Sequence, residues 1–434
     1  MARQQNLAGR MKPRIAFIGG GWAGCAAGLC LAEAGVAATL FEASPTLGGR
    51  ARIVQAHDLP LDNGQHLLLG AYQHTLELIA KVWPDNRHAL LRQPLALAQP
   101  PEFLLSCPTL PAPFHLLVGL LTAKGLTVDD KLAAARWMRT ALRKPLAEDI
   151  SVATLIATQP PSVRAALWEP LCVAALNTSI ADASAKTFIT ILDKVFAHAR
   201  ADSDLLFPRC DLTQLFPQPA VDRILARGGR VHTHTRISHL SSITTGFALS
   251  YLSGTEEFDR VIVAVAPQHV AKLIRTLPGM HDVVMGLSTY HYEAIATLYL
   301  QYPATVKLAR PMLGLANGPA QFVFDRGWTH GQSGLLALVA SAARRSQQQA
   351  ESWTQQACEQ LANIAMLPRP LWQKLIIEKQ ATYSCRPQLY RPENYTSLPG
   401  LFLAGDYTAG LYPATLEGAT LSGVKSAQLV LNSL

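Results

Sequence analysis

RIAFIGGGWAGCAAGLCLAEAGVAATLFEA, residues 14–43, is the stretch that decides the fold. An apolar run ends at Ile18 and is followed by a glycine turn, an alanine-rich helical pattern that reaches Gly35, and a second apolar run that ends on Glu42. Short continuous apolar runs are typical of buried strands, here separated by one helix. The stretch therefore predicts a strand, a helix and a second strand at the start of an α/β fold.

Three glycines of this turn, Gly19, Gly21 and Gly24, have GxGxxG spacing, and the spacing has a mechanical reason. Gly19 makes the tight turn, Gly21 lets the backbone approach a pyrophosphate, and Gly24 lets helix and strand pack closely. The phosphates then lie at the helix N-terminus, where free N–H groups favour anions. Glu42, about 20 residues further on, is placed to accept hydrogen bonds from a ribose diol. We therefore predict a dinucleotide site.

A second glycine motif, LGGRAR, occupies residues 47–52. Its glycine pair suits a loop that passes close to the same pyrophosphate, with Gly49 in the loop and Arg50 neutralising the phosphate charge. Taken alone, the motif is equally compatible with a simple surface turn.

The C-terminal stretch LPGLFLAGDYTAGLYPATLEGATLSGVKSAQLV, residues 398–430, has the same order of features: an apolar strand, a glycine-containing loop and a helix of small residues. An apolar strand, residues 401–404, ends at Gly405 and Asp406, and a small-residue helix opens later at Glu417, Gly418 and Ala419. The N-terminus of such a helix can face the N1/O2 side of a flavin, where negative charge accumulates on reduction. We expect Asp406 to reach a ribityl hydroxyl.

Two stretches between these ends complete the predicted sheet. FDRVIVAVAPQHV, residues 258–270, is typical of a buried parallel strand because its apolar run is continuous. RGGRVHTHTRISHL, residues 227–240, reads as an alternating strand that pairs near the adenine and includes the cofactor contact Ile237. His232 and His234 would share one face of that strand, and a solvated face is favoured over a metal pair.

Length and composition set the broad class. A chain of 434 residues predicts more than one domain. The net charge of +8 comes without a basic stripe interleaved with aromatics, so we expect no nucleic acid and favour an anionic membrane surface. Seven cysteines without a CxxC pair fit the reduced thiols of a cytoplasmic protein, and we expect no metal site. Residues 1–13 lack the apolar core of a secretory signal and are expected to be a disordered tail.

The uncharged stretch from Phe103 to Ala123 is long enough to suggest a membrane span, but three prolines break it. The next stretch, DDKLAAARWMRTALRKP, is a helical pattern with four cations, Arg136, Arg139, Arg143 and Lys144. An apolar patch beside a basic helix is typical of a protein that rests on a membrane surface. A buried helix pair with a solvated basic face explains the pattern equally well.

The motifs GGGWAGCAAGLCLAEAG, FEASPTLGGRAR, GDYTAG and LEGATLSG together resemble the FAD-dependent amine oxidase and phytoene desaturase superfamily. Within it, LDNGQHLLLGAY, WEPLCVAALNTS and DLLFPRCDLTQLFPQPA are similar to the bacterial hydroxysqualene dehydroxylases, also called squalene-associated FAD-dependent desaturases. The similarity runs from about Arg14 to the C-terminus and is weakest between Leu273 and Arg386.

This resemblance implies a doubly wound, Rossmann-type FAD-binding domain made of residues 14–79, 201–272 and 381–434. An α+β substrate domain would be inserted as residues 80–200 and 273–380. The resemblance further implies noncovalent FAD and an enzyme of squalene and hopanoid synthesis that removes the hydroxyl of hydroxysqualene with reduced flavin. Other enzymes of squalene synthesis would be its protein partners, in the cytoplasm or on the cytoplasmic face of the membrane.

Such a reaction needs an acid, because an allylic hydroxyl is a poor leaving group and a cation develops as the bond breaks. In the stretch LDNGQH we expect His66 to deliver the proton and Asp62 to orient it or stabilise the cation, with Asn63 beside them. Alternatively, Asp62 and Asn63 cap the helix that follows, residues 72–83. Glu169, in the apolar stretch WEPLCVAAL, is a second candidate acid whose pKa burial would raise, or a partnered carboxylate at a helix start.

Two other functions remain open at this point. An oxidative desaturase or amine oxidase would use the same flavin to remove hydride from a polyisoprenoid or an amine. A flavin-free prenyl-carrier protein of the same fold would lack the flavin motifs, which this sequence retains. We find no GxSxG elbow, P-loop or HExxH motif, so hydrolase, kinase and metalloprotease functions lack support.

Overall fold

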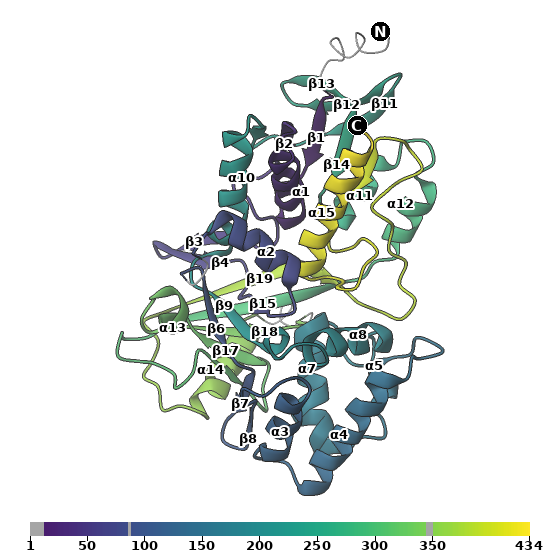
Figure 1. Cartoon of the computed structure of the whole chain (residues 1–434). Helices are drawn as coiled ribbons and strands as arrows, with labels where there is room; N and C mark the ends of the chain where they lie inside the picture. The colour runs from purple at the N-terminus through teal and green to yellow at the C-terminus, as the bar shows by residue number, and fades with distance from the viewer. Residues whose placement is uncertain (1–12, 86–87, 344–349) are drawn as a thin grey trace.

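The structure is a computed structural model that describes residues 13–85, 88–343 and 350–434. Figure 1 shows the parallel strands β1, β2 and β14 between α1, α10 and α15 in the upper half, with a second sheet below them and the helices α3 to α8 at the lower end. The expected α/β fold with an added α+β part is confirmed. Of the expected N-terminal tail, residues 1–12 lie outside the described residues.

The upper sheet has five parallel strands in the order β10-β2-β1-β14-β20. Their bounds are Arg230–His232 for β10, Ala38–Phe41 for β2, Ile15–Ile18 for β1, Arg260–Val263 for β14 and Leu401–Leu403 for β20. Since all five run the same way, their carboxyl ends meet at one edge. Segments from three distant parts of the chain therefore converge there, as the motifs predicted.

Three helices cover one face of this sheet: α1 (Trp22–Glu33), α10 (Pro217–Ala226) and α15 (Leu416–Asn432). The opposite face packs on the three-stranded antiparallel sheet of residues 239–258 and on Val270 and Ile274. The small residues expected in α15 have a packing reason. A Cβ on Gly423 would lie only 2.2 Å from the carbonyl oxygen of Ala23 in α1. Only glycine permits this close approach of the two helices.

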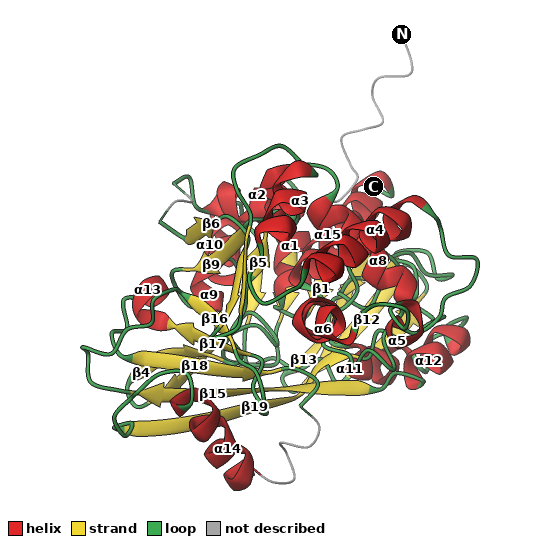
Figure 2. Ribbon diagram, turned by 90° about the horizontal axis from the view of Figure 1, so that it is seen from below, coloured by secondary structure: helices red, strands yellow, loops and turns green. Residues whose placement is uncertain are grey.

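The second sheet is antiparallel and has the order β16-β17-β18-β15-β19. Figure 2 shows it from below as a broad layer. The strands are Met312–Gly314, Phe322–Asp325, Leu335–Ala340, Tyr292–Gln301 and Trp372–Tyr383 in that order. The short helix α13 (Arg326–His330) follows β17, and α14 (Ala350–Ala362) packs near the sheet.

Shorter elements connect these layers. The strands are β3 (Ile53–Ala56), β4 (Leu59–Asp62), β5 (Leu68–Leu69), β6 (Leu90–Gln93), β7 (Ala96–Gln99), β8 (Phe103–Ser106), β9 (Leu205–Pro208), β11 (His239–Ile243), β12 (Gly246–Tyr251) and β13 (Gly254–Phe258). The helices are α2 (Gln73–Val82), α3 (Phe114–Thr122), α4 (Val128–Arg143), α5 (Val152–Leu155), α6 (Pro161–Val163), α7 (Glu169–Leu176), α8 (Ala185–Phe196), α9 (Leu212–Leu215), α11 (Pro267–Ile274) and α12 (His281–Ser288). A π-helical turn, Arg164–Trp168, and a 3-10 turn, Arg200–Ser203, complete the set.

The prediction of one alternating strand over residues 227–240 is wrong. The strand β10 ends at His232, and the chain then turns before β11 starts at His239. His234 has a φ of 53°, in the left-handed region, so it cannot continue a strand and does not share a face with His232. Instead, the His232 ring stacks on Phe41 at 5.2 Å between centroids.

The stretch from Phe103 to Ala123 is interrupted as its prolines predicted: β8 ends at Ser106 and α3 begins at Phe114. Within the described ranges, every helix is too short or too polar to cross a bilayer.

Candidate active site

A cavity of about 1050 Å³ is lined by residues at the carboxyl ends of the upper strands, by residues of the second sheet and by residues of the helices α7 and α8. Ligand sites usually have volumes of about 300–1,000 Å³, so this one has room for a cofactor together with a second molecule. Its wall changes in character along its length. Glycine backbone and charged groups line the end near the upper sheet, and apolar side chains line the other end.

The two glycine motifs lie against each other at the first end. The N–H of Gly48 donates to the carbonyl of Gly20 at 2.8 Å. A Cβ on Gly49 would lie 3.2 Å from the Cα of Gly21, and both glycines line the cavity. This narrow backbone cradle at the start of α1 fits a pyrophosphate, which binds to free N–H groups at a helix N-terminus. Gly24 contacts the carbonyl of Gly19 rather than the cavity, in keeping with its expected packing role.

Glu42 lines the cavity at the end of β2, where a ribose was expected. Its carboxylate accepts hydrogen bonds from the N–H of Gly20 at 2.6 Å and from the N–H of Ser44 at 2.7 Å. The side chain therefore also holds the glycine turn in shape. Ile237, 6% exposed, lines the same end.

We expected Arg50 to offer a free positive charge to a phosphate, but its guanidinium is already paired within the protein. Its guanidinium pairs with Asp406 at 2.6 Å and donates to the carbonyl of Ala381 at 2.8 Å. Burial opposes the charged form, but the carboxylate of Asp406 outweighs burial and raises the pKa of Arg50. The pair joins the second glycine motif to Gly405 and Asp406, and all three residues line the cavity.

Glu417 and Gly418, expected to contact the cofactor, do not line the cavity. The Glu417 carboxylate is 1% exposed and accepts from the N–H groups of His74 and Thr75 at the start of α2. It thus caps α2, which has no cap of its own. A Cβ on Gly418 would lie 2.0 Å from the carbonyl oxygen of Tyr412, so that glycine permits packing. Ala419 is the member of the trio that lines the cavity.

His66 lines the cavity, as do its neighbours Gly64 and Gln65. Its Nδ1 lies 2.8 Å from the carbonyl oxygen of Gly64. A carbonyl only accepts, so Nδ1 carries the proton and Nε2 keeps its lone pair. Burial, the largest cause, lowers the pKa of His66, while the Gly64 carbonyl and the Asp62 carboxylate partly oppose the shift. The resting imidazole is therefore neutral near pH 7.

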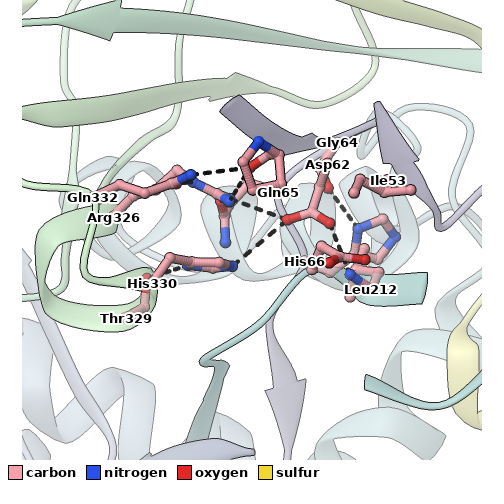
Figure 3. A network of polar contacts seen from close by, with 12 residues as sticks. Ile53, Asp62, Gly64, Gln65, His66, Leu212, Arg326, Thr329, His330 and Gln332 are labelled. Carbon is pink, nitrogen blue, oxygen red and sulfur yellow. Dashed lines mark hydrogen bonds and ion pairs between the residues drawn. The ribbon is translucent and has the colours of Figure 1, made fainter. Parts of the chain in front are cut away.

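Asp62 neither lines the cavity nor caps the helix that follows it. Its carboxylate is 1% exposed, lies outside the cavity wall, and pairs with the fully buried Arg326 at 3.0 Å (Figure 3). The other carboxylate oxygen accepts from the N–H of Leu212 at 2.9 Å, so Asp62 caps α9 and not α2. Burial raises the pKa of Asp62, and Arg326 opposes that shift. Asp62 therefore influences His66 only through its charge.

Polar neighbours surround this ion pair. Figure 3 shows Gln65, Gln332 and His330 around Arg326 and Asp62. His330 Nε2 lies 3.7 Å from Asp62, and burial lowers the pKa of His330 to about 3. His330 is therefore neutral, and Arg326 is the cation that balances Asp62.

Asn63 lines the cavity and is held in place by two hydrogen bonds. Its amide nitrogen donates to the carboxylate of Glu378 at 2.7 Å and to the carbonyl of Arg50 at 3.2 Å. Glu378, in β19, also lines the cavity and is a charged group that the sequence analysis missed. An acid in a strand 315 residues from Asn63 gives no sequence signal of this contact.

Glu169 does not contribute to the cavity, so its prediction as a buried acid is wrong. Its side chain is 39% exposed and lies 3.5 Å from Arg164, as the alternative of a partnered carboxylate at a helix start predicted. Pro170 and Leu171 of the same helix line the cavity instead, and so does Asn177 at the C-terminal end of α7. Two exposed cations that line the cavity, Arg236 and Lys272, were also missed, and so was the exposed imidazole of His269.

The far end of the cavity is an apolar chamber. Its wall comes from β7, β8, α7, α8 and the second sheet, and it includes Leu97, Phe103, Leu171, Ala175, Phe188, Ile191, Leu192, Val195, Phe196, Met312, Leu315, Phe322, Phe324 and Val339. Such a wall excludes water and binds a ligand by burial of apolar surface.

Comparison with known proteins agrees with this geometry. The sequence profile of the flavin-containing amine oxidoreductases matches residues 22–431. Hydroxysqualene dehydroxylase of Zymomonas mobilis is 24% identical over 411 residues, which are 89% of this chain and 92% of that protein. The enzyme of the same name from Rhodopseudomonas palustris is 26% identical over 417 residues, 91% of this chain and 92% of that protein. The resemblance found in the motifs is thereby confirmed.

Solved structures confirm the fold. An oxidoreductase from Methanosarcina mazei superposes with a TM-score of 0.75 at 17% identity and covers 96% of this chain and 99% of its own. Putrescine oxidase superposes with a TM-score of 0.74 at 13% identity over 97% of this chain and 99% of its own.

Proposed function

The chain belongs to the flavin-containing amine oxidoreductase family and is an FAD-dependent oxidoreductase, and from this premise we propose that it removes the hydroxyl group of hydroxysqualene to give squalene. The single observation that carries this proposal is the apolar chamber, which joins the glycine cradle in one cavity. Its wall suits a long hydrocarbon far better than a small polar amine.

The residues that would hold FAD are those of the cradle and its surroundings. Gly19, Gly21 and Gly49 would receive the pyrophosphate, Glu42 the ribose, and Ala419 at the start of α15 the flavin end. Bound and reduced, FAD supplies the hydride that the reaction consumes. Protonation of the hydroxyl releases water, and the hydride closes the carbon centre, so that hydroxysqualene, one proton and one hydride yield squalene and water.

In this proposal His66 binds the substrate hydroxyl through Nε2. The tautomer fixed by Gly64 leaves that nitrogen without a proton in the resting state, so His66 acts as the acid only after it has taken up a proton. Glu378, and not Asp62, is the carboxylate that can face a developing cation, because it lines the cavity beside Asn63. The chamber keeps water from the cation until hydride transfer is complete.

An anaerobic assay tests the reaction itself. The purified yellow protein is reduced with dithionite and incubated with hydroxysqualene, and squalene should form as the flavin becomes oxidised. The same protein, oxidised and under air, is incubated with squalene and with putrescine as controls. Flavin reduction by either control compound, without squalene formation from hydroxysqualene, would instead indicate an oxidative desaturase or an amine oxidase. A colourless protein that FAD does not restore would indicate the carrier function.

Replacing His66 by alanine should lower kcat for hydroxysqualene by about 10²–10⁴-fold while FAD stays bound. His88→Ala is the matched control, because that imidazole is exposed on the surface. Since burial lowers the pKa of His66, the protonated fraction rises about tenfold for each pH unit of acidification above that pKa. We therefore expect kcat/KM of the wild type to rise from pH 8 towards pH 6, and this slope should be absent in His66→Ala. The same slope in both proteins would exclude His66 as the acid.

A further inference from the structure

Apolar side chains gather on one exposed surface at the lower end of the molecule. Of the fifteen large apolar side chains exposed by the described residues, six lie within one short segment: Leu110, Phe114, Leu117, Leu121, Val128 and Leu132. Single exposed apolar residues are normal, but a cluster marks a surface that contacts a partner or a membrane. We call these six residues the α3–α4 patch.

The patch has the periodicity of two amphipathic helices. In α3, Phe114, Leu117 and Leu121 follow each other at the i, i+3 and i+7 positions, and Phe114 is 58% exposed. His115, Gly119 and Leu120 form the opposite, buried face, which packs on β8. In α4, Val128, 70% exposed, and Leu132 share one face. The ammonium group of Lys131 donates to the carbonyl of Leu121 at 3.1 Å and thereby joins the two helices.

Along α4 the same face changes from apolar to basic. Arg136, Arg139 and Arg143 follow Leu132 at helical spacing, and all three are exposed. Residues 102–144 contain six Lys and Arg against three Asp and Glu. One of these acids, Asp130, is buried in the capping box of α4. The charge of the surface is therefore complementary to an anionic partner.

The patch is also close to the apolar chamber. Phe103 of β8 lines the chamber, and α3 packs on β8 so closely that a Cβ on Gly119 would lie 3.1 Å from the carbonyl oxygen of Ser106. The cavity wall and the exposed patch are thus separated by the β8–α3 layer. Figure 1 shows this layer at the end of the molecule opposite the upper sheet.

We propose that the α3–α4 patch binds the surface of an anionic lipid bilayer. Phe114, Leu117, Leu121, Val128 and Leu132 enter the boundary between headgroups and acyl chains, and the three arginines of α4 bind the lipid phosphates. The arginine stems can extend along the apolar boundary while their guanidinium groups stay at the headgroups. This inference rests on the exposed surface alone and does not depend on the proposed reaction.

Sedimentation with vesicles tests the proposal on the flavin-loaded full chain. Wild type should bind vesicles that contain 30% phosphatidylglycerol and should be released at high salt. Arg136→Gln/Arg139→Gln/Arg143→Gln should weaken this binding roughly a hundredfold, since each cation near the surface contributes about 1 kcal/mol. The matched control, Arg223→Gln/Arg227→Gln/Lys425→Gln, removes three cations near the upper sheet and should bind like the wild type.

A second variant measures the depth of insertion without loss of charge. The tryptophan in Phe114→Trp should show a blue-shifted emission and quenching by brominated lipids when vesicles are added. Leu117→Gln/Leu121→Gln should weaken binding while the flavin content and Tm stay unchanged. Wild type that stays in the supernatant at low salt would overturn the proposal. So would self-association that the Leu117→Gln/Leu121→Gln pair abolishes, because the patch would then bind a second copy of this chain.

Discussion

Replacing Gly24 with alanine should strongly destabilise the fold, whereas the same change at Gly21 should give a stably folded protein that has lost FAD. A Cβ on Gly24 would lie 1.9 Å from the carbonyl oxygen of Gly19, in the turn that joins β1 to α1. Gly19 directly follows β1 and Gly24 lies in the first turn of α1, so the central strand and its helix restrain both backbone segments. Overpacking in a core typically costs about 1–3 kcal/mol, and a contact this short between two backbone segments should cost at least the upper end of that range.

At Gly21 the added methyl group meets the cavity instead of the protein. The atom nearest to the methyl group would be the Cα of Gly49, at 3.8 Å. The backbone of Gly21, with a φ of −76° and a ψ of −179°, is extended and suits any residue. The methyl group would occupy the space through which the pyrophosphate reaches the backbone N–H groups. Thermal unfolding and the ratio of absorbance at 450 nm to that at 280 nm distinguish the two variants. If Gly21→Ala retained stoichiometric FAD, the cradle would not be the cofactor site.

These glycines explain why the upper half of the fold could be predicted from the sequence. Each glycine is required by residues only a few positions away in the sequence, which are also close to it in space. The strands β1, β2 and β20 and the helices α1 and α15 followed from such local rules. The prediction of one strand over residues 258–270 is wrong in its bounds, because β14 ends at Val263 and α11 begins at Pro267, where the proline is suited to the first turn of a helix. The stretch 227–240 failed because alternation alone does not reveal the turn at His234.

The site residues that sequence reasoning misassigned have partners far away along the chain. Asp62 was placed beside the substrate, but its cation, Arg326, lies 264 residues further on. Glu417 was assigned to the flavin because it opens α15, yet it accepts from α2, more than 340 residues earlier. Periodicity shows which face of an element is buried. It does not show which element covers that face.

Replacing Arg326 with leucine should lower the free energy of unfolding by about 3–5 kcal/mol, because it leaves the carboxylate of Asp62 buried without its cation. Arg326 is 0% and Asp62 1% exposed, so water cannot replace the lost partner. The double variant Asp62→Asn/Arg326→Leu should recover at least half of this loss. Asparagine keeps an oxygen for the N–H of Leu212 and carries no charge.

The pH dependence of this loss distinguishes an unpaired charge from a packing defect. Burial raises the pKa of Asp62, and Arg326→Leu removes the cation that opposes this shift. A raised pKa in the folded state means that the carboxyl group destabilises the fold as the pH rises through that pKa, and that protonation at lower pH removes the cost. The free energy of unfolding, measured by urea denaturation, should therefore differ less between wild type and Arg326→Leu at pH 5 than at pH 7.5. The double variant Asp62→Asn/Arg326→Leu lacks the carboxyl group, so its stability relative to the wild type should not improve in this way at pH 5. If Arg326→Leu lost the same stability at both pH values, and if Asp62→Asn did not restore any of it, the guanidinium would stabilise the fold by filling space.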